Sequence, residues 1–414
     1  MSFKVIPLDE ALNLFEKEFE KVSFEFVNLE NANKRVIAED FYAPFDFPPF
    51  SKSTVDGYAV KASDTFGASE SNPLYFKIKG KIKIGEYPSY FISSSEVIEI
   101  PTGGVLPSGA DAAIMIEHTN KIDEDTVEIL KSVAPYENIV RIGEDFEKGK
   151  LIFEKGYRLK AQDLGVFSAF GIIRIKVYKK PDVSIISTGD EIIHPKEELN
   201  LGKVRDMNTY ILKALVEDSF ANPVILGITK DNLGEILEKL KKALEISNII
   251  IISGGSSVGT RDLTLKAISL LEDSKILFHG LNIKPGKPTI FAKVKGKAVI
   301  GLPGHPTSAT LVFLELVRPL IRFISGEKNW RKRIKLKTTV LENIHSAVGM
   351  KHFIRVKLKG NCAKPIYGKS ALIFPMIEAD GYFEINEQKE GVLKGEEVEI
   401  VLFEWEKIFF LLLF

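Results

Sequence analysis

Residues 247–264, SNIIIISGGSSVGTRDLT, join a run of four isoleucines to a glycine-rich turn that is followed at once by Arg261 and Asp262. A continuous apolar run of this kind is typical of a strand that is buried on both faces of a parallel sheet. Glycines let backbone N–H groups approach an anion closely. The P-loop pattern does not fit, because it needs Lys where this chain has Thr260, and the dinucleotide pattern needs other glycine spacings. The segment therefore predicts an anion-binding loop of another kind, with a carboxylate beside it.

The alternation of strands and helices extends from residue 182 to residue 325. The runs DVSIIST, NPVILGI, NIIIIS and KILFHG are expected to be strands. Between them, MNTYILKALVEDSF, NLGEILEKLKKALEI and DLTLKAISLLED have helical spacing, with Asn208 as the expected N-cap of the first. A hairpin, TIFAKVKGKAVIGLP, then leads into the helix SATLVFLELVRPLIRFI. This order predicts a three-layer α/β domain, in which helices cover both faces of a parallel-rich sheet.

The segments on either side have a different texture. Residues 8–20 are spaced as a helix, and residues 160–171 predict a second helix. Between about residues 25 and 150, short alternating runs separated by Gly, Pro, Ser and Asp predict antiparallel strands. Similar runs return after Gly326. The apolar end, IFFLLLF, is far shorter than the ~20 residues that span a bilayer, so we expect a last buried strand there.

Composition excludes several classes of protein. Lysine plus arginine and aspartate plus glutamate both number 56, which argues against a general nucleic-acid binder. Cys362 is the single cysteine, so one chain has neither a disulfide framework nor a thiolate metal site, and a cytoplasmic location is expected. The six histidines lack HExxH spacing, and the acidic start is not a signal peptide.

Charged residues follow each predicted strand of the α/β segment. Glu191, Asp231 and Asp262 follow the first three strands, and Lys284 and Lys287 follow the fourth. Ligands bind at the carboxyl ends of the strands in an open parallel sheet. Lysines neutralise an anion, whereas carboxylates repel it unless a divalent cation lies between them. The residues alone therefore predict a Mg2+-dependent site for a phosphorylated or nucleotide-linked ligand, with the three acids as candidate metal ligands.

Two glycine-rich turns on the same rim are expected to offer backbone N–H groups to the anion. The candidate ligand-binding residues of these turns are Gly254, Gly255, Ser256, Ser257, Gly259, Pro303, Gly304, His305 and Ser308. Ordinary turns and helix caps would explain any one of these segments. Together with the charged segments, five loops with such residues are expected on one rim, and this coincidence favours a binding site over ordinary turns.

A second group of motifs lies in the amino-terminal half. PFSKSTVDGYAV contains Asp56 and Gly57, the pair that a type I′ hairpin turn favours. IPTGGVLPSGADAAIMIEHT is expected to form two strands around a glycine-rich turn, and VRIGEDFEKG contains Arg141 and Asp145. Turn chemistry explains each of these motifs when it is taken singly.

Eight of these segments, in this order, resemble the MoeA family, the molybdopterin molybdenumtransferases, which include the E domain of gephyrin. They are SKSTVDGYAV, PTGGVLPSGADAAIMIE, RIGED, VSIISTGDEI, RDMNTYIL, ISGGSSVGTRD, IKPGKP and GLPGHPTSA. FIRV and GKSALIFPMIEADGYFEI resemble weaker carboxyl-terminal motifs, so the resemblance covers nearly the whole chain. It implies that molybdate is inserted into adenylylated molybdopterin, that the pyrophosphate link is cleaved with release of AMP, and that Mg2+ supports the reaction.

The resemblance also implies four domains and a homodimer. A small helical domain would comprise residues 1–26 and 149–180, and an inserted β domain residues 27–148. The α/β domain would span residues 181–325 and a carboxyl-terminal β domain residues 326–414. The active site would combine the α/β domain of one subunit with the β domain of the other.

Matched motif by motif, the family's site residues fall into three groups: the α/β site, the contribution of the partner subunit, and the last domain. In that order they are Glu191, Asp231, Asp262, Lys284 and Lys287; Asp56, Thr102 and Asp145; and Arg355 and Ser370. Two positions depart from the family. His305 stands where Asn is usual, and Met350 stands where a basic residue is common.

Two alternatives remain at this point. An adenylyltransferase of the MogA type shares the α/β domain, but it lacks segments such as STVDGYAV and RIGED. A scaffold that binds a partner peptide, as the gephyrin domain does, would not need the intact acids and lysines. The sequence does not distinguish molybdate from tungstate, and a MogA- or MoaB-type protein is a possible donor of the substrate.

Overall fold

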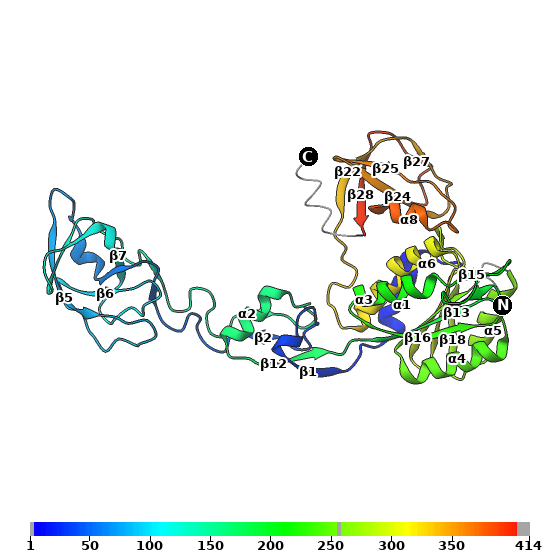
Figure 1. The fold of residues 1–414 in the computed structure, drawn as a ribbon, viewed down its shortest axis with the longest axis horizontal. Coiled ribbons are helices and arrows are strands. Elements are labelled where there is room, and N and C mark those ends of the chain that lie inside the picture. Colours follow the sequence, from blue (N-terminus) through cyan, green and yellow to red (C-terminus); the bar gives the residue numbers. More distant parts are fainter. Residues whose placement is uncertain (1–3, 255–257, 404–414) are drawn as a thin grey trace. The chain divides into compact units, whose positions relative to one another are not determined.

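The computed structural model describes residues 4–254 and 258–403, and only the backbone of residues 258–262. The strand predicted at the apolar carboxyl end therefore lies outside the described residues. The chain forms two compact units, shown in Figure 1. One comprises Met1–Glu39, Lys155–Gly165 and Ile173–Phe414, and the other comprises Asp40–Glu154 and Val166–Ile172. The finer division into four domains stays a prediction.

A six-stranded sheet forms the centre of the larger unit. Its order is β16-β13-β17-β21-β20-β18. The strands are β13 (Asp182–Thr188), β16 (Asn222–Thr229), β17 (Ile249–Gly254), β18 (Ser274–His279), β20 (Ile290–Val294) and β21 (Lys297–Leu302). The first four strands of the order are parallel to one another. β20 runs in the opposite direction and pairs antiparallel with β21 and with β18, so β18 runs in the same direction as the first four. The predicted parallel-rich sheet is confirmed.

Helices cover both faces of this sheet. They are α1 (Leu8–Glu18), α3 (Asn208–Asp218), α4 (Leu233–Ile246) and α5 (Val258–Ser269). Ile249 and Ile251 of β17 belong to the core that includes α1 and α3, whereas Ile250 and Ile252 belong to the core that includes α4 and α5. Successive side chains of a strand point to opposite faces, so the isoleucine run serves two cores at once. The sheet and the helices on its two faces form the predicted three-layer α/β domain.

Two helix predictions need correction. The helix expected over residues 262–273 instead spans Val258–Ser269, because apolar spacing marks only the turns that pack on the sheet. Residues 306–324 are helical throughout, as α6 (Pro306–Val312), a π-helical turn (Phe313–Val317) and α7 (Arg318–Ile324). This helix begins two residues before the predicted Ser308, with Pro306 in the first turn, where a missing N–H costs nothing.

A closed β-barrel follows the α/β domain in the chain. It consists of β22 (Leu336–Val340), β24 (Lys351–Lys359), β25 (Cys362–Pro365), β26 (Gly381–Ile385) and β28 (Glu397–Leu402). Closure results because β24 pairs with both β25 and β26. A short strand from the α/β domain, β19 (Ile283–Lys284), pairs in parallel with β24. This pairing fixes the lysine-containing loop against the barrel wall.

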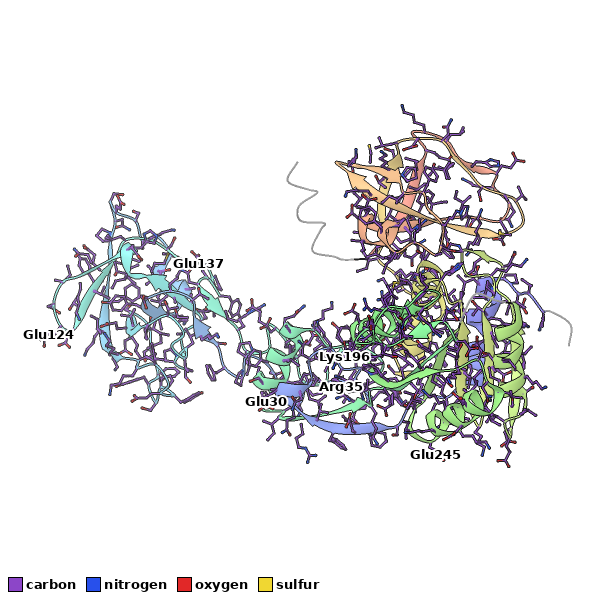
Figure 2. All side chains as sticks on the ribbon, turned by 45° about the vertical axis from the view of Figure 1, so that its right-hand side comes forward. Glu30, Arg35, Glu124, Glu137, Lys196 and Glu245 are labelled. Atoms are coloured by element: carbon purple, nitrogen blue, oxygen red, sulfur yellow. The ribbon has the colours of Figure 1, made fainter. Side chains whose placement is uncertain are left out.

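A two-stranded ribbon also belongs to the larger unit. It pairs β1 (Phe24–Asn28) with β12 (Arg174–Tyr178). Arg35, labelled in Figure 2, is buried beside it, donates to the carbonyl of Tyr178 at 2.8 Å and pairs with Glu25.

The predicted helix at residues 160–171 is α2 (Ala161–Ala169).

The smaller unit contains a six-stranded sheet of order β7-β4-β6-β5-β9-β8. Its strands are β4 (Gly57–Val60), β5 (Leu74–Lys81), β6 (Glu96–Ile100), β7 (Ala112–Met115), β8 (Thr119–Lys121) and β9 (Thr126–Ile129). The antiparallel prediction holds except for β5 and β6, which are parallel. The Asp56-Gly57 pair is not a hairpin turn, because Gly57 begins the strand β4 between β6 and β7.

None of the helices in the described part of the chain has the length and apolarity needed to cross a membrane.

Candidate active site

The candidate site lies at the edge where the parallel strands end. Strands β13, β16, β17 and β21 run in one direction, so the loops that follow them share one rim. Most of the residues predicted for the α/β site belong to these loops. Lys284 of β19 and Lys287 of the loop that follows it add two lysines from beside the barrel.

Three carboxylates gather on this rim after β13 and β16. Asp231 donates its backbone N–H to the Asp190 side chain at 3.2 Å. Burial raises the pKa of Asp231, and the negative charges of Asp190 and Glu191 raise it further. The Asp231 Oδ1 atom is buried and has no hydrogen-bond partner. Asp190 was not predicted as a site residue, although the sequence shows two adjacent acids after β13.

The carboxylates of Asp190, Glu191 and Asp231 are of the chemical type that binds a divalent cation. Carboxylate oxygens are the ligands that Mg2+ prefers, and a cation would relieve both the repulsion and the unpaired oxygen of Asp231. Among the residues whose side chains the structure describes, no three His, Cys, Asp or Glu side chains are arranged to hold a metal. Asp262 lies in α5, and its side chain is outside that set. The set Glu191, Asp231 and Asp262 stays a prediction.

The glycine-rich loop after β17 is described only in part. Gly254 ends β17, and a Cβ there would lie 2.6 Å from the Thr188 hydroxyl oxygen, which is buried and unpaired. Gly255, Ser256 and Ser257 lie outside the described residues, and Gly259 lies in the first turn of α5.

The Asn208 amide links strand β17 to the loop that follows β21. It donates to the Ser253 hydroxyl at 2.7 Å and to the carbonyl of Gly304 at 2.8 Å. Its predicted role as an N-cap is therefore wrong. Asn208 is the first residue of the helix and Met207 is its N-cap, while the Asp206 carboxylate accepts the N–H of Thr209 at 3.1 Å.

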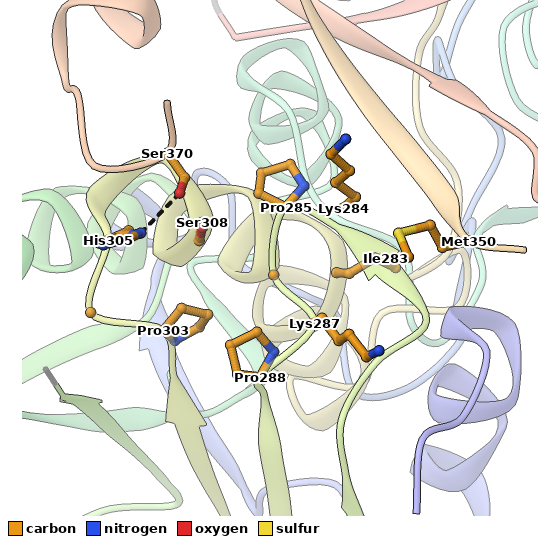
Figure 3. A pocket seen from close by; sticks show the side chains of 12 residues that line it. Ile283, Lys284, Pro285, Lys287, Pro288, Pro303, His305, Ser308, Met350 and Ser370 are labelled. Carbon is orange, nitrogen blue, oxygen red and sulfur yellow. Dashed lines mark hydrogen bonds between the residues drawn. The ribbon is translucent and has the colours of Figure 1, made fainter. Parts of the chain in front are cut away.

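A pocket of about 310 Å³ lies where the α/β domain meets the barrel, as Figure 3 shows. Loops 283–288 and 303–305 form most of its wall, and Ser308, Met350 and Ser370 complete it. The pocket brings together seven predicted residues: Lys284, Lys287, Pro303, Gly304, His305, Ser308 and Ser370. It is therefore lined by two lysines and two hydroxyls, with no carboxylate among the lining residues. Such a lining favours an anion.

The barrel wall beside Lys284 adds further positive charge. Arg355 is buried and donates one guanidinium nitrogen to the carbonyl of Gly368 at 2.8 Å, whereas its Nη1 is buried without a partner. Burial lowers the pKa of Arg355. Burial, followed by the charges of Lys284 and Arg355, lowers the pKa of His352 to about 4. His352 therefore stays neutral beside two cations at neutral pH.

The predicted partner-subunit residues lie in the smaller unit. The Asp56 carboxylate accepts the backbone N–H of Thr102 at 2.7 Å, so these two positions are brought together. Asp145 donates its backbone N–H to the carbonyl of Phe47 at 3.1 Å.

Comparisons with known proteins find matches along most of the chain. Three family models match: the MoeA N-terminal region (domains I and II) over residues 6–171, a probable molybdopterin-binding domain over 184–322, and the MoeA C-terminal region (domain IV) over 337–403. A molybdopterin molybdenumtransferase from Haemophilus influenzae is 32% identical over 406 residues, covering 96% of this chain and 98% of that protein.

Solved structures give the same result. The crystal structure of a molybdopterin biosynthesis MoeA protein from Pyrococcus horikoshii is 38% identical with a TM-score of 0.83, covering 97% of this chain and 100% of that chain. A second MoeA structure from the same organism is 34% identical with a TM-score of 0.84 and the same coverage.

Proposed function

We propose that this chain, which belongs to the MoeA family, is a molybdopterin molybdenumtransferase of molybdenum cofactor biosynthesis. In this reaction molybdate, or tungstate, is inserted into adenylylated molybdopterin and AMP is released. The observation that carries the proposal is the lysine-lined pocket at the α/β–barrel junction, on the same domain as a group of carboxylates. An oxyanion and a pyrophosphate need the positive surface, and a divalent cation needs the acidic one.

Each part of the site has a chemical task in this proposal. Lys284 and Lys287 neutralise the phosphate oxygens, whose negative charge grows as the pyrophosphate bond breaks. The Ser308 and Ser370 hydroxyls, which line the pocket, are donors for the oxyanion. Arg355 does not line the pocket and adds positive charge from the barrel wall. A water oxygen adds to the adenylyl phosphorus and gives up its proton to a carboxylate of the site, while the bond from that phosphorus to the bridging oxygen breaks. The molybdopterin phosphate, which keeps the bridging oxygen, is the leaving group, and the adenylyl part is released as AMP. When bound by Glu191, Asp231 and Asp262, Mg2+ supplies further positive charge to this leaving group.

The backbone of the rim completes the binding surface. The backbone N–H groups of Gly304 and His305, which precede α6, and of Gly259 in the first turn of α5 are the proposed donors to phosphate oxygens at helix amino ends. The acids hold or orient the attacking oxygen, because a carboxylate accepts a proton or a hydrogen bond from water.

The wider assembly belongs to the same proposal. We place Asp56, Thr102 and Asp145 of a partner subunit at the site, in a homodimer of four-domain chains. Support comes from the family membership, and the hydrogen bond between Asp56 and Thr102 brings two of these three positions together. A MogA- or MoaB-type protein would hand over the substrate. The cytoplasm is the proposed compartment, because the chain has a single cysteine.

One assay separates this function from its rivals. The purified protein is given Mg2+ and molybdate with adenylylated molybdopterin, and separately ATP with free molybdopterin. Molybdate-dependent release of AMP in the first mixture supports the insertase. Adenylylation in the second mixture alone would establish the MogA-type transferase, and no turnover in either mixture would leave a binding scaffold. Parallel reactions with tungstate determine the preferred oxyanion.

A further inference from the structure

His305 and Ser370 form a bond across the pocket that the proposed reaction does not yet use. The His305 Nδ1 atom lies 2.9 Å from the Ser370 hydroxyl oxygen, and both side chains line the pocket in Figure 3. His305 precedes α6 of the α/β domain, whereas Ser370 lies in the loop that follows β25 of the barrel. The bond therefore joins the two walls of the pocket.

The imidazole decides what the Ser370 hydroxyl can do. A serine hydroxyl has one proton and two lone pairs, and it rotates to suit its partner. If Nδ1 accepts, the serine proton is used in that bond and is lost to a ligand. If Nδ1 donates, Ser370 accepts through a lone pair and its own proton is free to point into the pocket. Ser370 can donate to a ligand with negative oxygens only in the second arrangement.

We propose that His305 is a positioning residue, which donates its Nδ1–H to Ser370 so that the Ser370 hydroxyl donates to a tetrahedral oxyanion. The inference rests on the proposed function for the identity of the oxyanion. It assigns His305 no contact with the reacting atoms. An asparagine amide can make the same donation, because its nitrogen carries two protons.

A nearby residue provides a matched control. The Thr307 hydroxyl donates to the carbonyl of Leu372 at 3.0 Å, and its backbone N–H donates to the carbonyl of Ser370 at 3.3 Å. Replacing Thr307 by Val removes a tether between the same two segments but leaves the His305–Ser370 bond in place. A loss of affinity that came only from loosening this junction would appear in Thr307→Val as well as in His305→Ala.

The test measures molybdate binding by isothermal titration calorimetry, together with the KM for molybdate in the AMP-release assay. The variants are His305→Ala, His305→Asn, Ser370→Ala, Thr307→Val and the double variant His305→Ala with Ser370→Ala, each checked for folding by circular dichroism. We expect His305→Ala to weaken binding by about three- to tenfold, the usual effect of one hydrogen bond, with little change in kcat. His305→Asn should restore most of the affinity, and the double variant should be no weaker than Ser370→Ala alone.

Several results would overturn the inference. Additive losses in the double variant would mean that His305 does not act through Ser370. Equal losses in Thr307→Val and His305→Ala would reduce the bond to a structural tether. Absence of molybdate binding by the wild-type protein would also refute it. Binding without release of AMP would refute the proposed function alone, and the variant series would still decide the role of His305.

Discussion

His352 should make this protein lose stability in mild acid. Its side chain lies in β24, with Nδ1 3.2 Å from the hydroxyl oxygen of the buried Ser346. Burial, and then the charges of Lys284 and Arg355, lower its pKa to about 4 from the ordinary value of 6.5. Between these two pH values the unfolded chain binds a proton that the folded chain does not. Stability therefore falls as the pH drops from 6.5 to 4, and His352 has no such effect above pH 7.

The size of the effect follows from the two pKa values. Each pH unit between them costs about 1.4 kcal/mol, so the loss at pH 4 is about 3 kcal/mol, to within a factor of two. Replacing His352 by Gln removes the titrating group. The free energy of unfolding of His352→Gln should therefore fall less than that of the wild type between pH 7 and pH 4.

Urea unfolding, followed by tryptophan fluorescence at several pH values, measures this difference. His345 lies in β23 (Ile344–His345), and its side chain is exposed, so His345→Gln is the matched control. The control should follow the wild-type pH profile. Parallel profiles for wild type and His352→Gln from pH 7 to pH 4 would refute the reasoning, because they would mean that His352 titrates normally in the folded chain.

Three further predictions test other parts of the account. Asp231→Asn should stabilise the metal-free protein at pH 7, because the raised pKa of Asp231 means that its negative charge is unfavourable in the folded chain. Near-saturating Mg2+ should raise the melting temperature of the wild type by about 2–4 °C and that of the variant not at all, so an equal Mg2+ response in both would contradict this. Glu315→Leu removes the buried carboxylate that pairs with half-buried Arg333 and should cost about 3–5 kcal/mol in thermal unfolding. Most of this loss should be recovered in the double variant with Arg333→Met; a double variant as unstable as the single one would argue against a paired charge. Gly57→Ala would place a Cβ 1.9 Å from the carbonyl oxygen of Ile114, so a loss of about 3 kcal/mol is expected, and an unchanged melting temperature would show that the strand shifts freely.

The sequence predicted the α/β domain well because its signal is local. The isoleucine run of β17 faces two cores, and the helices around it have one apolar face each, so periodicity and burial agree. The rim followed from one topological rule, since parallel strands end at one edge. The motif resemblance then supplied residues that lie far from this domain in sequence, such as Ser370, which the structure places in the pocket.

Other features depended on contacts that the sequence does not display. The barrel closes through pairing of β24 with β26, and β5 lies parallel to β6, yet strand direction is not written in an alternating pattern. Asn208 looked like a helix cap because its side chain suits that role, but Ser253 of β17 and Gly304 in the loop after β21 both accept from its amide. The unpaired Nη1 of Arg355 arises from burial in the folded barrel.

The most direct test of the proposed function is the stoichiometry of a single turnover. Wild-type protein in excess over adenylylated molybdopterin is mixed with Mg2+ and molybdate, and the AMP released and the molybdenum bound to pterin are measured in the same samples. The account predicts about one AMP for each molybdenum inserted, with little AMP when molybdate is left out and a severe loss of both products in Lys284→Met. Release of AMP at the same rate without molybdate, or with no molybdenum on the pterin, would contradict it.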